Sequence, residues 1–171
     1  MDRAVYCIAR SSAQAERIIT ELKQVGFLGD DISVLLADKG GTRDFAHEHN
    51  TKAPEGAVTG GVAGMGVGAA IGWLAGVGTL VIPGVGPLLA AGPVLAALSG
   101  AAVGGAAGGV IGGLAGLGMP EYEAKLYDGK IRAGNILISV HTEDGKQRGR
   151  AKDIFEAAGA EDIASTSEAT V

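Results

Sequence analysis

The sequence predicts an α+β fold in which two charged flanks form one split domain around an uncharged run. The chain has 171 residues and a formal net charge of −5, yet Gly56 to Pro120 contains no Asp, Glu, Lys, Arg, His, Asn or Gln. On each side of this run the pattern is strand, helix, strand. The length suits one or two domains, and the acidic balance argues against a nucleic-acid partner.

Strands are expected where short apolar or alternating segments occur, over 4–9, 31–38, 135–143 and 161–168. The single cysteine, Cys7, lies inside the first of them and is expected to be a core residue rather than a reactive thiol. The predicted order is βαβ, insert, βαβ. This order corresponds to a split ferredoxin-like domain with an insert between its second and third strands.

A helix is predicted between the strands of each half because its start and its end both carry a signal. Ser11 precedes Gln14 by three residues and Asp144 precedes Gln147 by three, which is the spacing of a capping box. Apolar residues then recur at helical spacing. Glycines that can adopt the C′ conformation follow these helices, at Gly26 and Gly159.

Within the uncharged run, glycine recurs every fourth residue, which is the spacing of one helix face. Glycine in a helix costs roughly 1 kcal/mol relative to alanine, and close backbone packing away from water offsets this cost. We therefore expect a glycine-zipper hairpin of two helices, over 57–82 and 88–119, that also packs against further copies. The expected packing and oligomerisation positions are Gly56, Gly60, Gly64, Gly68, Gly72, Gly76, Gly100, Gly104, Gly105, Gly108, Gly109, Gly112, Gly113 and Gly116.

The tip of this hairpin is expected at "IPGVGP", where prolines and glycines end any helix. Both predicted helices exceed the roughly 20 residues that cross a bilayer. The tip carries no charge, so a transmembrane and a re-entrant hairpin both remain open. Both ends of the insert return to one sheet and therefore lie on one side of any membrane. The expected tip residues are Pro83, Gly84, Gly86, Pro87 and Pro93.

After the second glycine helix, residues 120–134 predict a further helix that begins at Pro120. Tyr122 and Tyr127 are candidate membrane-interface residues, with Lys52 from the linker. Packing of this helix against the sheet is the open alternative. The expected organisation is 1–40 as the first half of the domain, 41–55 as a linker, 56–119 as the glycine-zipper hairpin, 120–134 as an interfacial helix and 135–171 as the second half.

The residues that could carry chemistry do not form a recognisable site. His47 and His49 lie two apart in the predicted linker, whereas the histidines of a zinc protease helix lie four apart. Gly-x-Gly triplets such as that at Gly64 lack the strand and acidic residue of a dinucleotide site. Glu161 and Asp162 are interpreted as a solvated turn. We expect no catalytic residue, no metal and no cofactor.

Four segments carry a family resemblance: "FAHEHNTKAPEG", "GWLAGVGTLVIPGVGPLLAAGPVLAAL", "GLGMPEYEAKLYDGKIRAGNILISVH" and "AEDI". They resemble bacterial general stress proteins with a heat-induced YflT-type domain, also labelled low-temperature-induced proteins. The resemblance covers nearly the whole chain. It implies a stress-associated role and membrane association, without enzymatic activity and without catalytic residues to transfer.

These observations predict a non-enzymatic bacterial protein whose partners are membrane lipid and further copies of itself. The zipper helices would organise or protect the inner membrane, with the split domain and both termini cytoplasmic. Two alternatives remain open. One is a soluble oligomer whose apolar core binds lipid or other apolar cargo. The other is an oligomeric pore, although no ionisable residue is present to line it.

Overall fold

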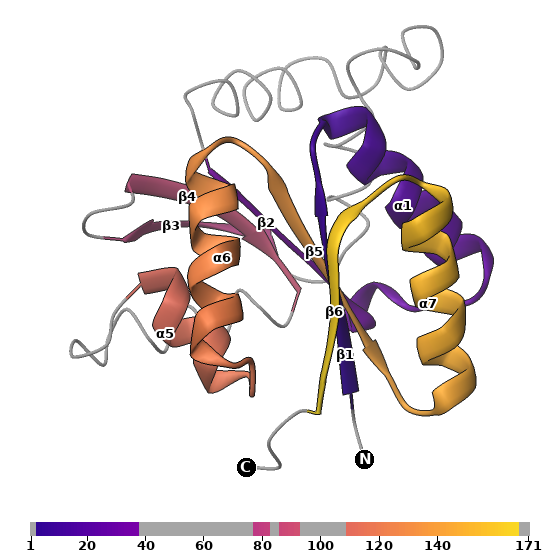
Figure 1. Cartoon of the computed structure of the whole chain (residues 1–171). Coiled ribbons are helices and arrows are strands. Elements are labelled where there is room, and N and C mark those ends of the chain that lie inside the picture. The colour runs from indigo at the N-terminus through magenta and orange to yellow at the C-terminus, as the bar shows by residue number, and fades with distance from the viewer. Residues whose placement is uncertain (1–2, 38–76, 83–85, 93–108, 168–171) are drawn as a thin grey trace, which may run out of the picture.

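The computed structural model describes residues 3–37, 77–82, 86–92 and 109–167. They form an antiparallel sheet with helices on both faces (Figure 1), which confirms the α+β class. The strands are β1 (Arg3–Ala9), β2 (Ile32–Ala37), β3 (Val77–Ile82), β4 (Gly86–Ala91), β5 (Ile136–Thr142) and β6 (Glu161–Ser167). The helices are α1 (Ser12–Gln24), the 3-10 helix η1 (Gly29–Asp31), α5 (Gly109–Gly116), α6 (Glu121–Arg132) and α7 (Gly145–Ala157).

The strand order interleaves the two flanks of the sequence. The order is β3-β4-β2-β5-β1-β6, and every neighbouring pair is antiparallel. Strand β5, from the second flank, lies between β1 and β2 of the first. The four strands expected from the flanks are therefore present and share one sheet, so neither flank forms its sheet alone.

Strand β1 is buried on both faces, as its unbroken apolar sequence predicts. Every residue from Ala4 to Ile8 is at most 3% exposed. Because side chains alternate along a strand, Val5 and Cys7 pack on one side of the sheet, while Tyr6 and Ile8 pack on the other. Strand β1 therefore contributes side chains to the apolar cores on both faces of the sheet.

The helix boundaries follow from the capping residues. The Ser11 hydroxyl accepts a hydrogen bond from the Gln14 backbone N–H at 3.2 Å, and Asp144 Oδ1 accepts one from the Gln147 N–H at 2.7 Å. In each case the glutamine side chain accepts a hydrogen bond from the N–H of the residue before the cap. These contacts satisfy backbone donors that the first helical turn leaves unpaired. Both predicted helix starts are therefore confirmed.

Two apolar cores are present, and the helices that contribute to them lie on opposite faces of the sheet (Figure 1). The first is formed with α1 and α7, including Ile18, Leu22 and Phe155. The second is formed with α5 and α6, including Leu114 and Tyr127. Helices α1 and α7, one from each βαβ half, therefore lie on the same face of the sheet. The second face is covered by α5, which lies at the end of the uncharged run, and by α6, which follows the run.

The prediction of helix throughout 57–82 and 88–119 is wrong where the structure describes these residues. Val77–Ile82 and Gly86–Ala91 are paired strands, and only Gly109–Gly116 is helical. The physical reason is the composition on either side of the turn: β-branched Val, Thr and Ile favour strands, and a short Pro/Gly segment joins hairpin strands. Pairing of β4 with β2 then attaches this hairpin to the sheet.

Gly92 shows why β4 ends where it does. Its φ is +81°, and a Cβ at this position would lie 2.2 Å from the carbonyl oxygen of Ile32 on β2. Only glycine avoids both the left-handed strain and this overlap. Gly92 therefore lies at a close approach between backbones of the sheet, not on a helical glycine stripe.

Candidate functional site

Of the expected packing glycines, the structure describes those of helix α5. Gly109, Gly112, Gly113 and Gly116 lie on this helix, which packs against α6 and buries Val110 and Leu114 in the second core. A Cβ at Gly116 would meet nothing within 4 Å, so no other described element approaches that position closely. The remaining positions lie outside the described residues: Gly56, Gly60, Gly64, Gly68, Gly72, Gly76, Gly100, Gly104, Gly105 and Gly108.

The described segments on either side of the expected hairpin tip are strands and not helices. Gly86 and Pro87 are the first residues of β4 and pair with Ile82 and Val81 of β3. Pro83, Gly84 and Pro93 lie outside the described residues. The expectation that helices flank the tip is therefore wrong where the structure describes the flanking residues, which form paired strands.

The two candidate interface tyrosines of α6 have different surroundings. Tyr122 is 70% exposed, and Leu126, one turn later, is 44% exposed. Tyr127 is only 1% exposed and packs in the core, with its ring 6.2 Å from that of Tyr6. Tyr127 is therefore a structural residue rather than an interfacial one. Lys52 lies outside the described residues.

The Tyr127 hydroxyl connects α6 to the irregular start of β6. It donates a hydrogen bond of 2.5 Å to the carbonyl oxygen of Asp162. Asp162 has a φ of +50°, and the pairing of β6 with β1 shifts register here, which is typical of a β-bulge. Burial, followed by the nearby carboxylates of Glu123 and Asp162, raises the pKa of Tyr127. The phenol therefore stays protonated and holds the bulge against the helix.

Charged side chains surround this bulge. Lys130 Nζ lies 3.6 Å from a carboxylate oxygen of Glu161 and 3.5 Å from one of Asp162. Arg10 forms a second ion pair with Glu161. The interpretation of Glu161 and Asp162 as a turn is wrong because both residues begin β6, whereas Asp162 is exposed to solvent as expected. Their partners come from distant parts of the chain, so no local sequence signal identifies them.

The titratable and metal-binding candidates do not form a reactive centre in the described part of the chain. Cys7 is fully buried, and this burial raises the pKa of its thiol, so the thiolate required for nucleophilic or metal chemistry is disfavoured. Residues 3–37, 77–82, 86–92 and 109–167 contain no group of three His, Cys, Asp or Glu side chains able to hold a metal. His47 and His49 lie outside them.

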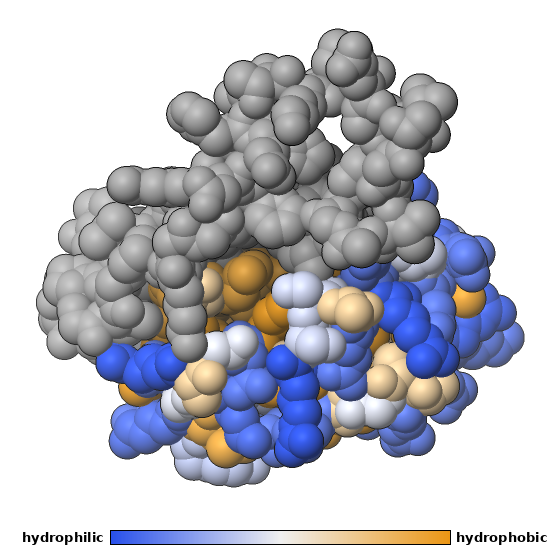
Figure 2. Space-filling model, turned by 90° about the horizontal axis from the view of Figure 1, so that it is seen from above, coloured by the Kyte–Doolittle hydropathy of each residue, from blue (hydrophilic) through white to orange (hydrophobic). Residues whose placement is uncertain are grey.

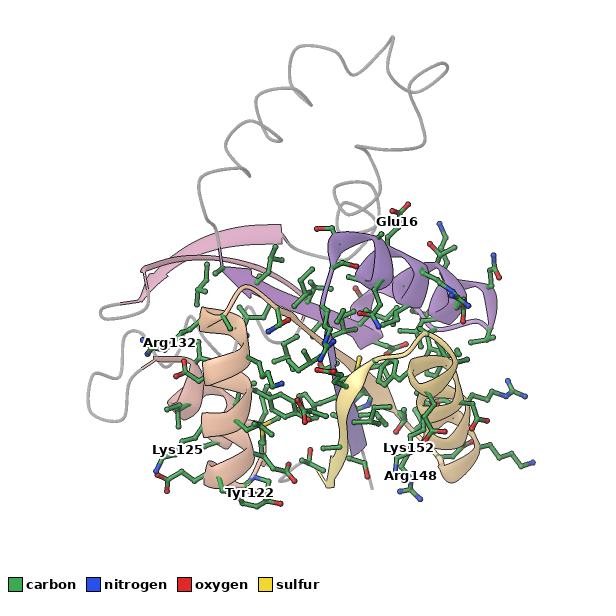
Figure 3. All side chains as sticks on the ribbon, turned by 45° about the horizontal axis from the view of Figure 1, so that its top comes forward. Glu16, Tyr122, Lys125, Arg132, Arg148 and Lys152 are labelled. Carbon is green, nitrogen blue, oxygen red and sulfur yellow. The ribbon has the colours of Figure 1, made fainter. Side chains whose placement is uncertain are left out.

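Charge divides the sheet into two parts. Strands β2, β4 and β3, which we call the uncharged half of the sheet, contain no Asp, Glu, Lys, Arg or His. Charged side chains point outward from the helices, among them Arg148 and Lys152 of α7 and Lys125 of α6 (Figure 3). Seen from above, apolar side chains of described residues gather in the middle of the face, with hydrophilic ones beside them (Figure 2).

The helices of the described part are short. None of them is both long enough and apolar enough to cross a bilayer.

Comparison of the chain with protein-family models, with curated proteins and with solved structures finds no match.

Proposed function

We propose that this chain is a non-enzymatic, self-assembling protein that organises or protects a bilayer under stress. The folded domain would present the uncharged run to lipid and to further copies of the protein. The observation that carries this proposal is the division of the chain into charged flanks and an uncharged, glycine-rich run. The flanks contain all 33 acidic and basic residues, whereas Gly56 to Pro120 contains none.

The interleaved sheet supports this proposal because it makes the charged flanks one folding unit. The order β6-β1-β5-β2 and the placement of α1 and α7 on one face are consistent with a split ferredoxin-like domain. In such a domain both ends of the uncharged run are attached to one sheet. Any lipid-binding part of the run is then held beside the domain at two points, and the domain and both flanks lie on one side of the bilayer.

A second candidate function is a soluble oligomer that binds lipid or apolar cargo in a shared core. One observation favours it: part of the uncharged run packs in the domain's own core. Leu88 and Ala90 of β4 are buried, as are Val110 and Leu114 of α5. An uncharged segment whose side chains are already covered by protein has less apolar area to offer to a membrane.

Vesicle flotation of the full chain separates the two candidates. Vesicles of phosphatidylcholine and phosphatidylglycerol are mixed with the protein, and density centrifugation then separates bound from free protein. Membrane organisation predicts co-flotation that resists carbonate. Recovery of the protein only as a discrete lipid-free oligomer in detergent-free buffer would overturn the membrane proposal and favour the soluble one.

A matched pair of variants tests whether the uncharged run is responsible. Leu74→Lys adds one positive charge inside the run, and Gln24→Lys adds the same charge at an exposed position of α1. A charged side chain in the centre of a bilayer costs about 3 kcal/mol or more, so we expect Leu74→Lys to reduce flotation by about a hundredfold or more. Gln24→Lys should leave it unchanged. Equal flotation of both variants would contradict the assignment.

A further inference from the structure

The two edges of the sheet differ in how they are protected against pairing with another chain. Edge strands carry free backbone N–H and C=O groups, and proteins protect them with bulges, charges or covering segments. Strand β6 forms one edge, and β3 forms the other. Only an unprotected edge can readily accept a further strand.

Strand β6 carries two kinds of protection. The bulge at Asp162 breaks the regular register with β1, and its φ of +50° turns the backbone. Glu161 and Asp162 place two carboxylates at this edge, both ion-paired to Lys130. A second strand that paired here would meet an irregular backbone and fixed charges, both of which disfavour pairing.

Strand β3 carries neither kind of protection. Its six residues, Val77–Ile82, pair with β4 in one continuous register without a shift. Its sequence, VGTLVI, contains no charge and no proline. Alternate residues of an antiparallel edge strand direct their N–H and C=O groups outward, and within the described residues no further strand pairs with β3.

From this contrast we propose that β3 is the self-association surface of the protein, where it pairs antiparallel with β3 of a second copy. Both strands and the adjoining uncharged half of the sheet lack charge, so two chains of net charge −5 can approach there with the least repulsion. The contact is isologous and uses the same edge of each copy. Because β6 is protected, the sheet of the described residues offers one pairing edge, and pairing through this edge closes at a dimer.

This inference names the contact for the self-assembly proposed above and rests on that part of the proposed function, but it does not depend on lipid binding. The test measures the dimer dissociation constant of the full chain by sedimentation, in buffer without lipid. Thr79→Lys places a lysine in β3 of each copy, close to its counterpart. Ser165→Lys is the matched control, because Ser165 is an exposed residue of the β6 edge.

We expect Thr79→Lys to raise the dissociation constant about tenfold or more, because like charges face each other across the new strand pair. Ser165→Lys should change it less than about twofold. Hydrogen exchange of the wild-type protein supplies a measurement that no folding defect of a variant can affect. Amides of 77–82 should become protected as the protein concentration rises through the dissociation constant.

Three results would overturn the inference: a wild-type chain that stays monomeric, β3 amides equally protected in monomer and dimer, or a Thr79→Lys dimer as tight as wild type. Equal protection in the monomer would show that another segment of the same chain occupies the edge. Gly68→Leu distinguishes this failure from failure of the proposed function. If Gly68→Leu dissociates the assembly and Thr79→Lys does not, self-assembly stands but occurs through the glycine stripe.

Discussion

Replacing Gly92 by alanine tests whether β4 docks on β2 or whether this segment is a glycine-zipper helix. Alanine at a φ of +81° costs about 1–2 kcal/mol in the left-handed region. Its Cβ would also lie 2.2 Å from the Ile32 carbonyl oxygen, whereas such atoms normally stay about 3.3 Å or more apart. Because the Cβ is fixed by the backbone that carries it and its partner is a backbone oxygen, no rotamer change relieves the overlap, and shifting the strands adds about 1–3 kcal/mol.

Gly26→Ala is the matched control. Gly26 has a φ of +101°, but a Cβ there meets nothing within 4 Å. Both substitutions restrict the unfolded chain equally, so the difference between them isolates the overlap with Ile32. In urea unfolding followed by circular dichroism, the free energy of unfolding of Gly92→Ala should be about 1–3 kcal/mol lower than that of Gly26→Ala. The dependence of this free energy on urea concentration should be the same for both variants. In a helix, by contrast, glycine to alanine would stabilise by roughly 1 kcal/mol, so a Gly92→Ala variant at least as stable as wild type would refute the strand assignment.

Three further predictions concern the flanking domain. The Cys7 thiol should react with a maleimide only on unfolding, and fast labelling of the native protein would contradict its burial. Tyr127→Phe should cost about 1–2 kcal/mol at neutral pH, because the Asp162 carbonyl loses its donor. Burial raises the folded-state pKa of Tyr127 above its unfolded value near 10. The contribution of Tyr127 to the free energy of unfolding is therefore present below about pH 10 and is lost as the pH rises further. Between pH 8 and pH 11 the urea midpoint should fall less in Tyr127→Phe than in the wild type. Ser11→Ala should cost about 1 kcal/mol by the same assay, whereas Ser12→Ala, one residue later and outside the cap, should cost less.

The flanking elements could be predicted because their signals are local. Ser11 and Asp144 cap helices through contacts three residues away, and Gly26 and Gly159 end these helices at positive φ. The apolar sequence of β1 was sufficient to place it in the core. The sharing of one sheet by the strands of both flanks could be predicted from the repeated βαβ pattern, because two incomplete halves must join to bury their apolar faces.

The uncharged run could not be predicted in the same way, because its period suits more than one structure. A glycine every fourth residue matches a helix face, but apolar segments such as "VGTLVI" and "GPLLAA" are equally compatible with buried strands. Pairing of β4 with β2, far apart in sequence, decides between them. The contacts that Tyr127 and Lys130 make with Asp162 likewise depend on long-range packing, so the sequence near Asp162 does not predict them.

The position of β5 between β1 and β2 has a consequence for synthesis of the protein on the ribosome. β1 and β2 cannot form their sheet until β5 is made, because β5 is the strand to which both are hydrogen bonded. About 100 residues separate the end of β2 from the start of β5, which at roughly 5–20 residues per second takes about 5–20 s. The whole uncharged run is translated during this interval, before the flanking domain can complete its sheet.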